Sequence, residues 1–122
     1  MIFLKFSIRG KMKMVTNKLG VKLDSNGYAP SLFYGWTQKS WKTKTIKPDL
    51  VRHEVFYGTA NRKLSKEYGC WVYLEPEWHN MSNKGVHFNK ELDLQLKREC
   101  QAEFEMAYPD LDFVKIFGKN YL

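Results

Sequence analysis

The sequence has little cysteine and no long apolar run. Its two cysteines, Cys70 and Cys100, show neither a CxxC pair nor the dense spacing of a disulfide scaffold. The opening residues MIFLKFSIRGKMKM hold too short an apolar run for a secretion signal, and no segment approaches the ~20 apolar residues of a membrane span. We therefore expect a cytoplasmic protein with reduced, partly buried thiols and no membrane contact.

Acidic residues are scarce in the first part of the chain. Residues 1–48 hold ten Lys or Arg and a single acid, Asp24, whereas residues 49–122 hold ten Lys or Arg and twelve acids. The formal net charge of +7 therefore divides into +9 and −2. This concentration of cations favours contact with a polyanion through its phosphate backbone, and a solvated, solubilising tail is the alternative.

Internal repeats and low-complexity tracts are also absent. A chain of 122 residues can bury one core but not two, and its 16% aromatic content indicates that most of it folds. We expect a small single α+β domain over residues 24–122. A basic arm over residues 1–23 should precede it, either mobile or holding a short strand.

Alternation and turn residues predict the first elements of the domain. Alternating apolar and polar side chains predict a strand over residues 50–58 and a second β-rich run over 70–76. A short polar helix over 61–69, closed by a glycine, should connect them. The basic and aromatic stretch 31–49 is typical of either an irregular arm or a weak hairpin, after a turn at 24–30.

Helical spacing predicts the C-terminal elements. A short helix or 3₁₀ turn should begin at Pro76, because proline suits the first helical position. An amphipathic helix is predicted over residues 89–108 with Asn89 as its N-cap, and a short helix over 110–117 with Asp110 as its cap. The apolar stripe of the long helix is Leu92, Leu96, Cys100, Phe104 and Ala107.

All three histidines fall in one 35-residue window. His53 lies on the first predicted strand, His79 on the short helix and His87 just after it. Imidazole can bind a divalent metal or take a proton from water, and a strand and a following helix can bring two such side chains to one point. The alternative is three histidines that serve packing alone.

A family resemblance can be stated on these residues. The run from DLVRHEVFYGTANRKLSKEYG through WVYLEPEWHN and GVHFNKE to FGKNYL resembles small HNH-type (ββα-metal, His-Me finger) nuclease-like proteins of bacteriophages and prophages. The strand His, Gly-x-x-Asn-Arg, the helix His and Val-His occur in the family's order. The resemblance implies an HNH-like hairpin-helix core and metal-dependent cutting or nicking of DNA in a bacterial host cell.

The resemblance also implies roles at the candidate metal site. His53 matches a motif position that serves as general base or as ligand, and Glu54 stands where relatives often have a second histidine. Either of these two residues is a candidate base, and Glu54 could instead be a carboxylate ligand for Mg²⁺ or Mn²⁺. His79 and His87 match the motif's closing histidines and are candidate metal ligands. A salt bridge is the alternative for Glu54, and a backbone hydrogen bond the alternative for His87.

Nucleic-acid contacts are expected from the loop of the motif and from the basic N-terminal half of the chain. The resemblance places Asn61 and Arg62 in that loop, where turn chemistry and a salt bridge are the alternative to phosphate contact. The expected DNA contacts are Arg52, Asn61, Arg62, Lys63, Lys66, Lys42 and Lys44.

The sequence departs from the family pattern at several positions. Relatives often carry paired cysteines that make a structural zinc knuckle, and here Glu75 and Trp78 stand where two of them would be, so a structural zinc is not expected. The motif's middle asparagine is not evident before WVYL. An inactive HNH scaffold is therefore the alternative function. It would bind nucleic acid or a host protein that handles nucleic acid, as an inhibitor or a recombination accessory. An assembly protein is the third possibility.

Overall fold

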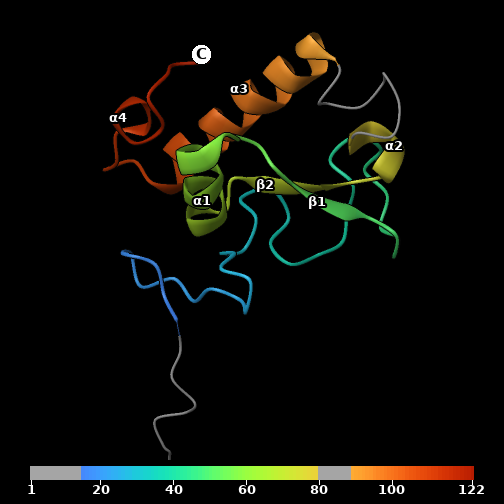
Figure 1. Cartoon of the computed structure of the whole chain (residues 1–122), viewed down its shortest axis with the longest axis horizontal. Coiled ribbons are helices and arrows are strands. Elements are labelled where there is room, and N and C mark those ends of the chain that lie inside the picture. Colours follow the sequence, from blue (N-terminus) through green and yellow to red (C-terminus); the bar gives the residue numbers. More distant parts are fainter. Residues whose placement is uncertain (1–14, 80–88) are drawn as a thin grey trace, which may run out of the picture.

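The described part of the chain folds around a ribbon of two antiparallel strands with helices beside it (Figure 1). The computed structural model describes residues 15–79 and 89–122. The elements follow in the order β1 (Val51–Glu54), α1 (Thr59–Tyr68), β2 (Trp71–Leu74), α2 (Pro76–His79), α3 (Lys90–Ala107) and α4 (Phe113–Phe117). This is a small α+β fold, as the sequence predicts.

The register of the ribbon gives its two faces different chemistry. His53 stands opposite Val72 and Arg52 opposite Tyr73, and successive side chains of a strand point to opposite faces. The histidine face, as we call it, carries Val51, His53, Val72 and Leu74, and the arginine face carries Arg52, Glu54, Trp71 and Tyr73. All four residues of β2 are buried, so both faces are covered.

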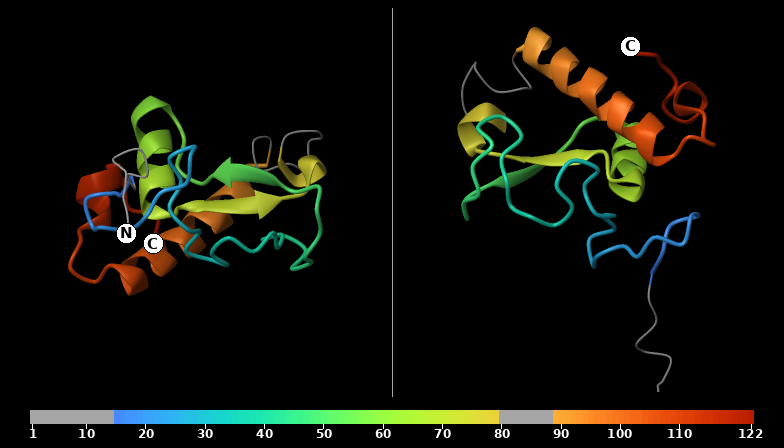
Figure 2. Two further views of the ribbon diagram at one scale, coloured as in Figure 1. Left: turned by 90° about the horizontal axis from the view of Figure 1, so that it is seen from below. Right: turned by 180° about the vertical axis from the view of Figure 1, so that it is seen from behind.

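Helix α3 lies on one side of the ribbon, and residues 15–36 lie on the other (Figures 1 and 2). The helix buries most of its predicted apolar stripe in the same core cluster as Val72, on the histidine face. Its N-cap is Asn89, as predicted, because the Asn89 side chain accepts a hydrogen bond from Leu92 N at 3.1 Å. Ala107 is exposed instead of buried, because the helix ends at this residue.

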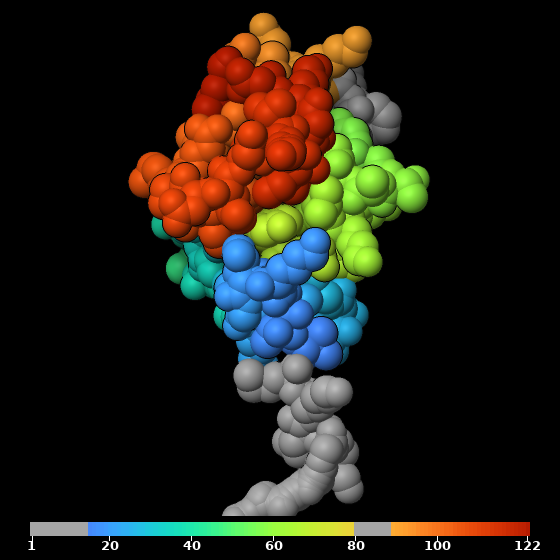
Figure 3. Space-filling model, turned by 90° about the vertical axis from the view of Figure 1, so that its left-hand side faces the viewer, coloured from blue at the N-terminus to red at the C-terminus, as the bar shows by residue number. Residues whose placement is uncertain are grey.

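The N-terminal segment covers the arginine face without forming a regular helix or strand. Tyr28 and Trp36 place their rings 5.3 and 6.0 Å from that of Trp71. Gly69 allows the close approach of this segment, since it has φ +77° and a Cβ there would lie 2.2 Å from Pro30 O. Figure 3 shows residues 15–30 (blue) seated against α1 (green).

The predicted basic arm is tied to the domain where the structure describes it, from residue 15 onward. Asn17 is buried and donates from Nδ2 to Glu67 O at 2.7 Å. A single antiparallel bridge joins Thr16 and Lys22, in place of a strand. Residues 1–14 lie outside the described range.

The strand β1 is shorter, and α1 longer, than the sequence predicts. The regular strand ends at Glu54, although Val55 N still donates to Cys70 O at 2.9 Å. Beyond it, Ser65 of α1 binds the backbone of Phe56: its hydroxyl donates to Phe56 O at 2.7 Å and accepts from Phe56 N at 3.1 Å. The chain then turns at Gly58 and enters α1 at Thr59, two residues earlier than predicted.

The two short helices follow the prediction at their cores and differ at their ends. Helix α4 begins at Phe113 and its N-cap is Asp112, not Asp110, because the Asp112 carboxylate accepts a hydrogen bond from Lys115 N at 3.1 Å. Helix α2 begins at Pro76 as predicted. Its expected continuation lies outside the described residues.

The stretch 31–49 combines both predicted alternatives. It is mostly irregular, but an antiparallel bridge between Lys39 and Ile46 forms a minimal hairpin, and a parallel bridge joins Ser40 to Tyr73 of β2. Glu75, the residue that follows β2, holds this hairpin in place. It is 4% exposed and accepts hydrogen bonds from the hydroxyls of Ser40 and Thr43.

Both cysteines are free thiols and fully buried, which is more than the partial burial expected. Burial and a hydrogen bond with Cys70 raise the pKa of the Cys100 thiol, so it stays protonated at neutral pH. Among the helices of the described ranges, none has the length and apolar character needed to cross a bilayer.

Candidate functional site

His53 and His79 come together beside the ribbon. His53 lies on the histidine face of β1 and is 1% exposed. Helix α2 begins immediately after β2, and Glu75 O accepts hydrogen bonds from Trp78 N and His79 N, which fixes the turn that carries His79. The two imidazole rings lie 5.2 Å apart between centroids, with their planes inclined by 73°. The strand and the short helix that carry the two histidines of the motif therefore meet at His53 and His79.

The separation of the two rings is suitable for one shared ion. Imidazoles whose nitrogens lie about 2.1 Å from the same metal have ring centroids roughly 4.5–5.5 Å apart. Within residues 15–79 and 89–122, however, no group of three His, Cys, Asp or Glu side chains converges. His87, the remaining histidine of the motif, lies outside the described residues. The candidate metal ligands among the described residues are thus two imidazoles. Transition-metal ions bind imidazole nitrogen more readily than Mg²⁺ does.

Glu54 is not part of this pair. It lies on the arginine face, where its carboxylate accepts a hydrogen bond from the hydroxyl of Tyr28 and lies 3.6 Å from Arg62 Nε. Burial and the bond to this carboxylate raise the pKa of Tyr28, which keeps the phenol a hydrogen-bond donor. Adjacent positions in β1 thus put His53 and Glu54 on opposite sides of the ribbon, and the structure gives Glu54 the salt bridge that the sequence left as its alternative role.

A second polar group lies next to His53 and was not identified from the sequence. The ring of Tyr57 lies 6.1 Å from that of His53, and its hydroxyl donates to Asp93 Oδ2 at 3.0 Å. Lys97 Nζ binds the same carboxylate oxygen at 2.5 Å and lies 4.0 Å from the centroid of the Tyr57 ring. Burial and Asp93 raise the pKa of Tyr57 to about 12. The spacing of Asp93 and Lys97 predicts a helix-face ion pair, but only the packing of α3 places it near β1.

Arg52 is held against aromatic rings and is only partly exposed. Its guanidinium carbon lies 4.6 Å from the ring centroid of Tyr28 and 4.7 Å from that of Trp71, and Nη1 forms a 2.7 Å ion pair with Asp24. The cation–π contacts and the ion pair therefore engage a guanidinium that the sequence predicts to contact DNA phosphate. Its structural role is to join the N-terminal segment to the ribbon.

Two further expected DNA contacts, Lys42 and Lys44, lie on the exposed hairpin near α2. Lys42 Nζ sits 4.6 Å from the ring centroid of Trp78, the residue that precedes His79. Lys44 Nζ donates to Trp41 O and lies 5.3 Å from the centroid of the Trp41 ring. Lys42 is therefore an expected phosphate contact that packs against α2, the helix that carries His79.

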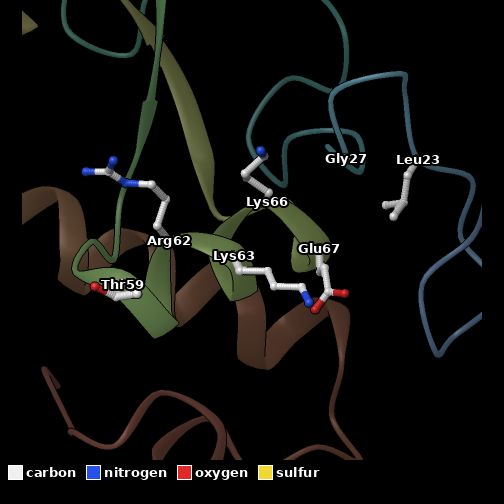
Figure 4. A pocket seen from close by; sticks show the side chains of 7 residues that line it. All are labelled: Leu23, Gly27, Thr59, Arg62, Lys63, Lys66 and Glu67. Atoms are coloured by element: carbon white, nitrogen blue, oxygen red, sulfur yellow. The ribbon is translucent and has the colours of Figure 1, made fainter.

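The remaining expected contacts belong to α1. Asn61 donates from Nδ2 to Phe117 O at 3.2 Å, and so links α1 to α4. Arg62, Lys63 and Lys66 line one side of a cavity of about 440 Å³ (Figure 4). We call it the cationic pocket; its other lining residues are Leu23, Gly27, Thr59 and Glu67. The expected DNA contacts thus fall into separate groups, and three of them share this pocket.

Comparisons of the chain with protein-family models, with curated proteins and with solved structures find no match. Any function must therefore be argued from the chemistry and geometry of the side chains themselves.

Proposed function

We propose that the chain is a divalent-metal-dependent DNA endonuclease or nickase of HNH type. The observation that carries the proposal is the meeting of His53 from β1 and His79 from α2, with ring centroids 5.2 Å apart. A strand of an antiparallel ribbon and the helix that follows it supply these two imidazoles, in the order of the family motif. Imidazole serves both roles that phosphodiester hydrolysis requires, proton transfer and metal binding.

The two histidines have different tasks in this proposal. His53 is buried on the ribbon, so the surrounding side chains restrict the orientation of its ring, which suits a general base that takes a proton from water. His79 is half-buried at the end of α2 and suits a metal ligand, with His87 as the next expected ligand. A bound Mn²⁺ or Mg²⁺ would supply charge stabilisation for the phosphate and leaving-group oxygens. Lys42, beside Trp78, would hold the adjacent DNA backbone.

The second candidate is a binding protein without catalysis. It is supported by the position of Glu54, which faces Tyr28 and Arg62 and not His53. It is also supported by the number of candidate metal ligands, because among the described residues no third His, Cys, Asp or Glu side chain joins the two imidazoles. Such a protein would bind DNA, or a host protein that handles nucleic acid, by means of its basic surface.

A nicking assay tests the first candidate against the second. Supercoiled plasmid should be nicked by the wild type in Mn²⁺ or Mg²⁺, and nicking should be lost in His53→Ala and His79→Ala. His53→Asn keeps a polar side chain at the buried position and should also be inactive, while Gln95→Ala, an exposed change on α3, should cut normally. Robust cutting by His53→Ala would refute the proposed chemistry.

A metal titration completes the comparison. Calorimetry with Mn²⁺ should detect one site in the wild type and a weakened site in His79→Ala, because that variant loses an imidazole nitrogen. A wild type that binds DNA but neither binds metal nor nicks the plasmid would favour the second candidate.

A further inference from the structure

Two cavities adjoin each other along the N-terminal segment. One is the cationic pocket on α1. The other, of about 500 Å³, lies against residues 21–25 of the same segment, and we call it the tryptophan slot. Leu23 lines both, so the two cavities are neighbours. Besides Leu23, the tryptophan slot is lined by Val21, Lys22, Asp24, Ser25, Pro30 and Trp36.

The tryptophan slot offers an exposed and well-supported aromatic surface. Trp36 is 46% exposed, although its ring packs 6.0 Å from that of the buried Trp71. The guanidinium of Arg52 lies 5.7 Å from the Trp36 ring centroid and helps to hold it in place. Because the Asp24 carboxylate is already paired with Arg52 at 2.7 Å, the acid on the slot wall is largely neutralised. An indole held by packing on one side and open on the other is a surface on which a flat ring can stack.

The cationic pocket brings positive charge to the edge of that slot. Arg62, Lys63 and Lys66 outnumber the single acid of the pocket, Glu67. Arg62 is 60% exposed, and its contact with Glu54 is a long one at 3.6 Å, so its guanidinium is accessible to an anion. Arg62 and Lys66 are four residues apart on α1, a rise of about 6 Å. These three cations of α1 can contact phosphates of one strand.

We propose that these two neighbouring cavities together bind single-stranded nucleic acid, with an unpaired base stacked on Trp36 and the backbone along Arg62, Lys63 and Lys66. Aromatic stacking beside a cationic groove is the combination that single strands require. A duplex cannot occupy the slot in the same way, because its base faces are already stacked on one another. The tryptophan slot lies on the side of the arginine face, where Trp36 packs against Trp71, whereas His53 lies on the histidine face with His79 beside it. The proposal therefore does not depend on the nuclease function.

Fluorescence anisotropy with labelled oligonucleotides tests the proposal. The wild type should bind an oligothymidine of about 16 nucleotides, the upper end of the site sizes of small single-strand-binding domains. It should bind the matching duplex, and a strand whose bases have been removed, about tenfold more weakly, because neither presents a base to Trp36. Equal affinity for the single strand, the duplex and the base-free strand would overturn the proposal. An oligouridine arm, run in parallel, assigns the site to DNA or to RNA.

Variants locate the site. Trp36→Ala should weaken binding of the single strand about tenfold, and Trp36→Phe, which keeps a ring against Trp71, should restore most of it. Lys63→Gln should lower the slope of log affinity against log salt by about 0.7, as expected for one lost phosphate contact. The matched controls are Met106→Ala, an exposed apolar side chain on α3, and Lys119→Gln, an exposed cation near the C-terminus. Wild-type affinity in Trp36→Ala would overturn the proposal.

The same assay separates this proposal from the nuclease. His53→Ala should bind the oligothymidine as tightly as the wild type does, because His53 lies on the opposite face of the ribbon. A protein that fails to nick DNA but still prefers the single strand would retain this site and lose only the proposed catalysis.

Discussion

Glu75 connects the basic hairpin to the candidate histidine site, and its removal is our most quantitative prediction. Its carboxylate accepts hydrogen bonds from Ser40 Oγ and Thr43 Oγ1, the second at 2.6 Å, and pairs with Lys47 Nζ at 3.1 Å. Its backbone oxygen starts α2, which carries His79. Glu75→Gln keeps the shape of the side chain and removes its charge.

The pKa of Glu75 gives the size of the expected effect. Burial alone would raise this pKa, but the hydrogen bonds from Ser40 and Thr43 outweigh burial and lower it from 4.5 to about 2. A carboxyl with that difference between the unfolded and folded chain contributes about 3 kcal/mol to the free energy of unfolding at neutral pH. Because the folded pKa is the lower one, this contribution is complete above pH 4.5 and is lost as the pH falls toward about 2.

Urea unfolding followed by tryptophan fluorescence measures this effect. Glu75→Gln should be less stable than the wild type by about 2–3 kcal/mol at neutral pH, and the difference should shrink toward zero as the pH falls through the range from 4.5 to about 2. Asp49→Asn, a change in an exposed turn, should lower stability by less than about 0.5 kcal/mol. A difference between Glu75→Gln and the wild type that stays constant over this pH range would refute the reasoning.

Two further substitutions test the packing of the N-terminal segment and the start of α3. Gly69→Ala should destabilise the protein by more than about 1 kcal/mol, measured by urea unfolding, because of the φ of +77° and the 2.2 Å approach to Pro30 O; an unchanged midpoint would contradict the close approach. Asn89→Ala should cost about 1 kcal/mol by removing the N-cap of α3, and Asn89→Asp should restore it; equal stability of the alanine and aspartate variants would contradict the capping role.

The position of Glu54 shows where reading the sequence alone falls short. Next to His53 in the chain, it is a plausible partner in catalysis. Because successive side chains of a strand point to opposite faces, Glu54 could equally serve a different site from His53. Only the segments that pack on the two faces of the ribbon show which of these holds. Tyr28, 26 residues earlier, packs over the arginine face and binds Glu54 there. Such a contact has no local signal in the sequence.

Arg52 gives the same lesson for the cations. A basic residue in a basic chain is reasonably assigned to phosphate. In the folded protein its guanidinium lies against aromatic rings and is paired with Asp24, so its charge stabilises the fold. Lys63 has the same charge but lies on the exposed side of α1, in the cationic pocket. Formal charge is a property of the sequence, whereas its availability depends on which surfaces pack together.

Features that depend on near neighbours in the chain can be predicted from the sequence. Helical periodicity and the Asn89 cap define most of α3, alternation locates β1 and β2, and Pro76 begins α2, because each arises from backbone geometry and side chains a few residues apart. Which side chains share a face, and which charges stay accessible, follows from the folded packing alone. Those outcomes depend on the packing of residues 15–36 and α3 against opposite faces of the ribbon, through contacts between residues far apart in the sequence.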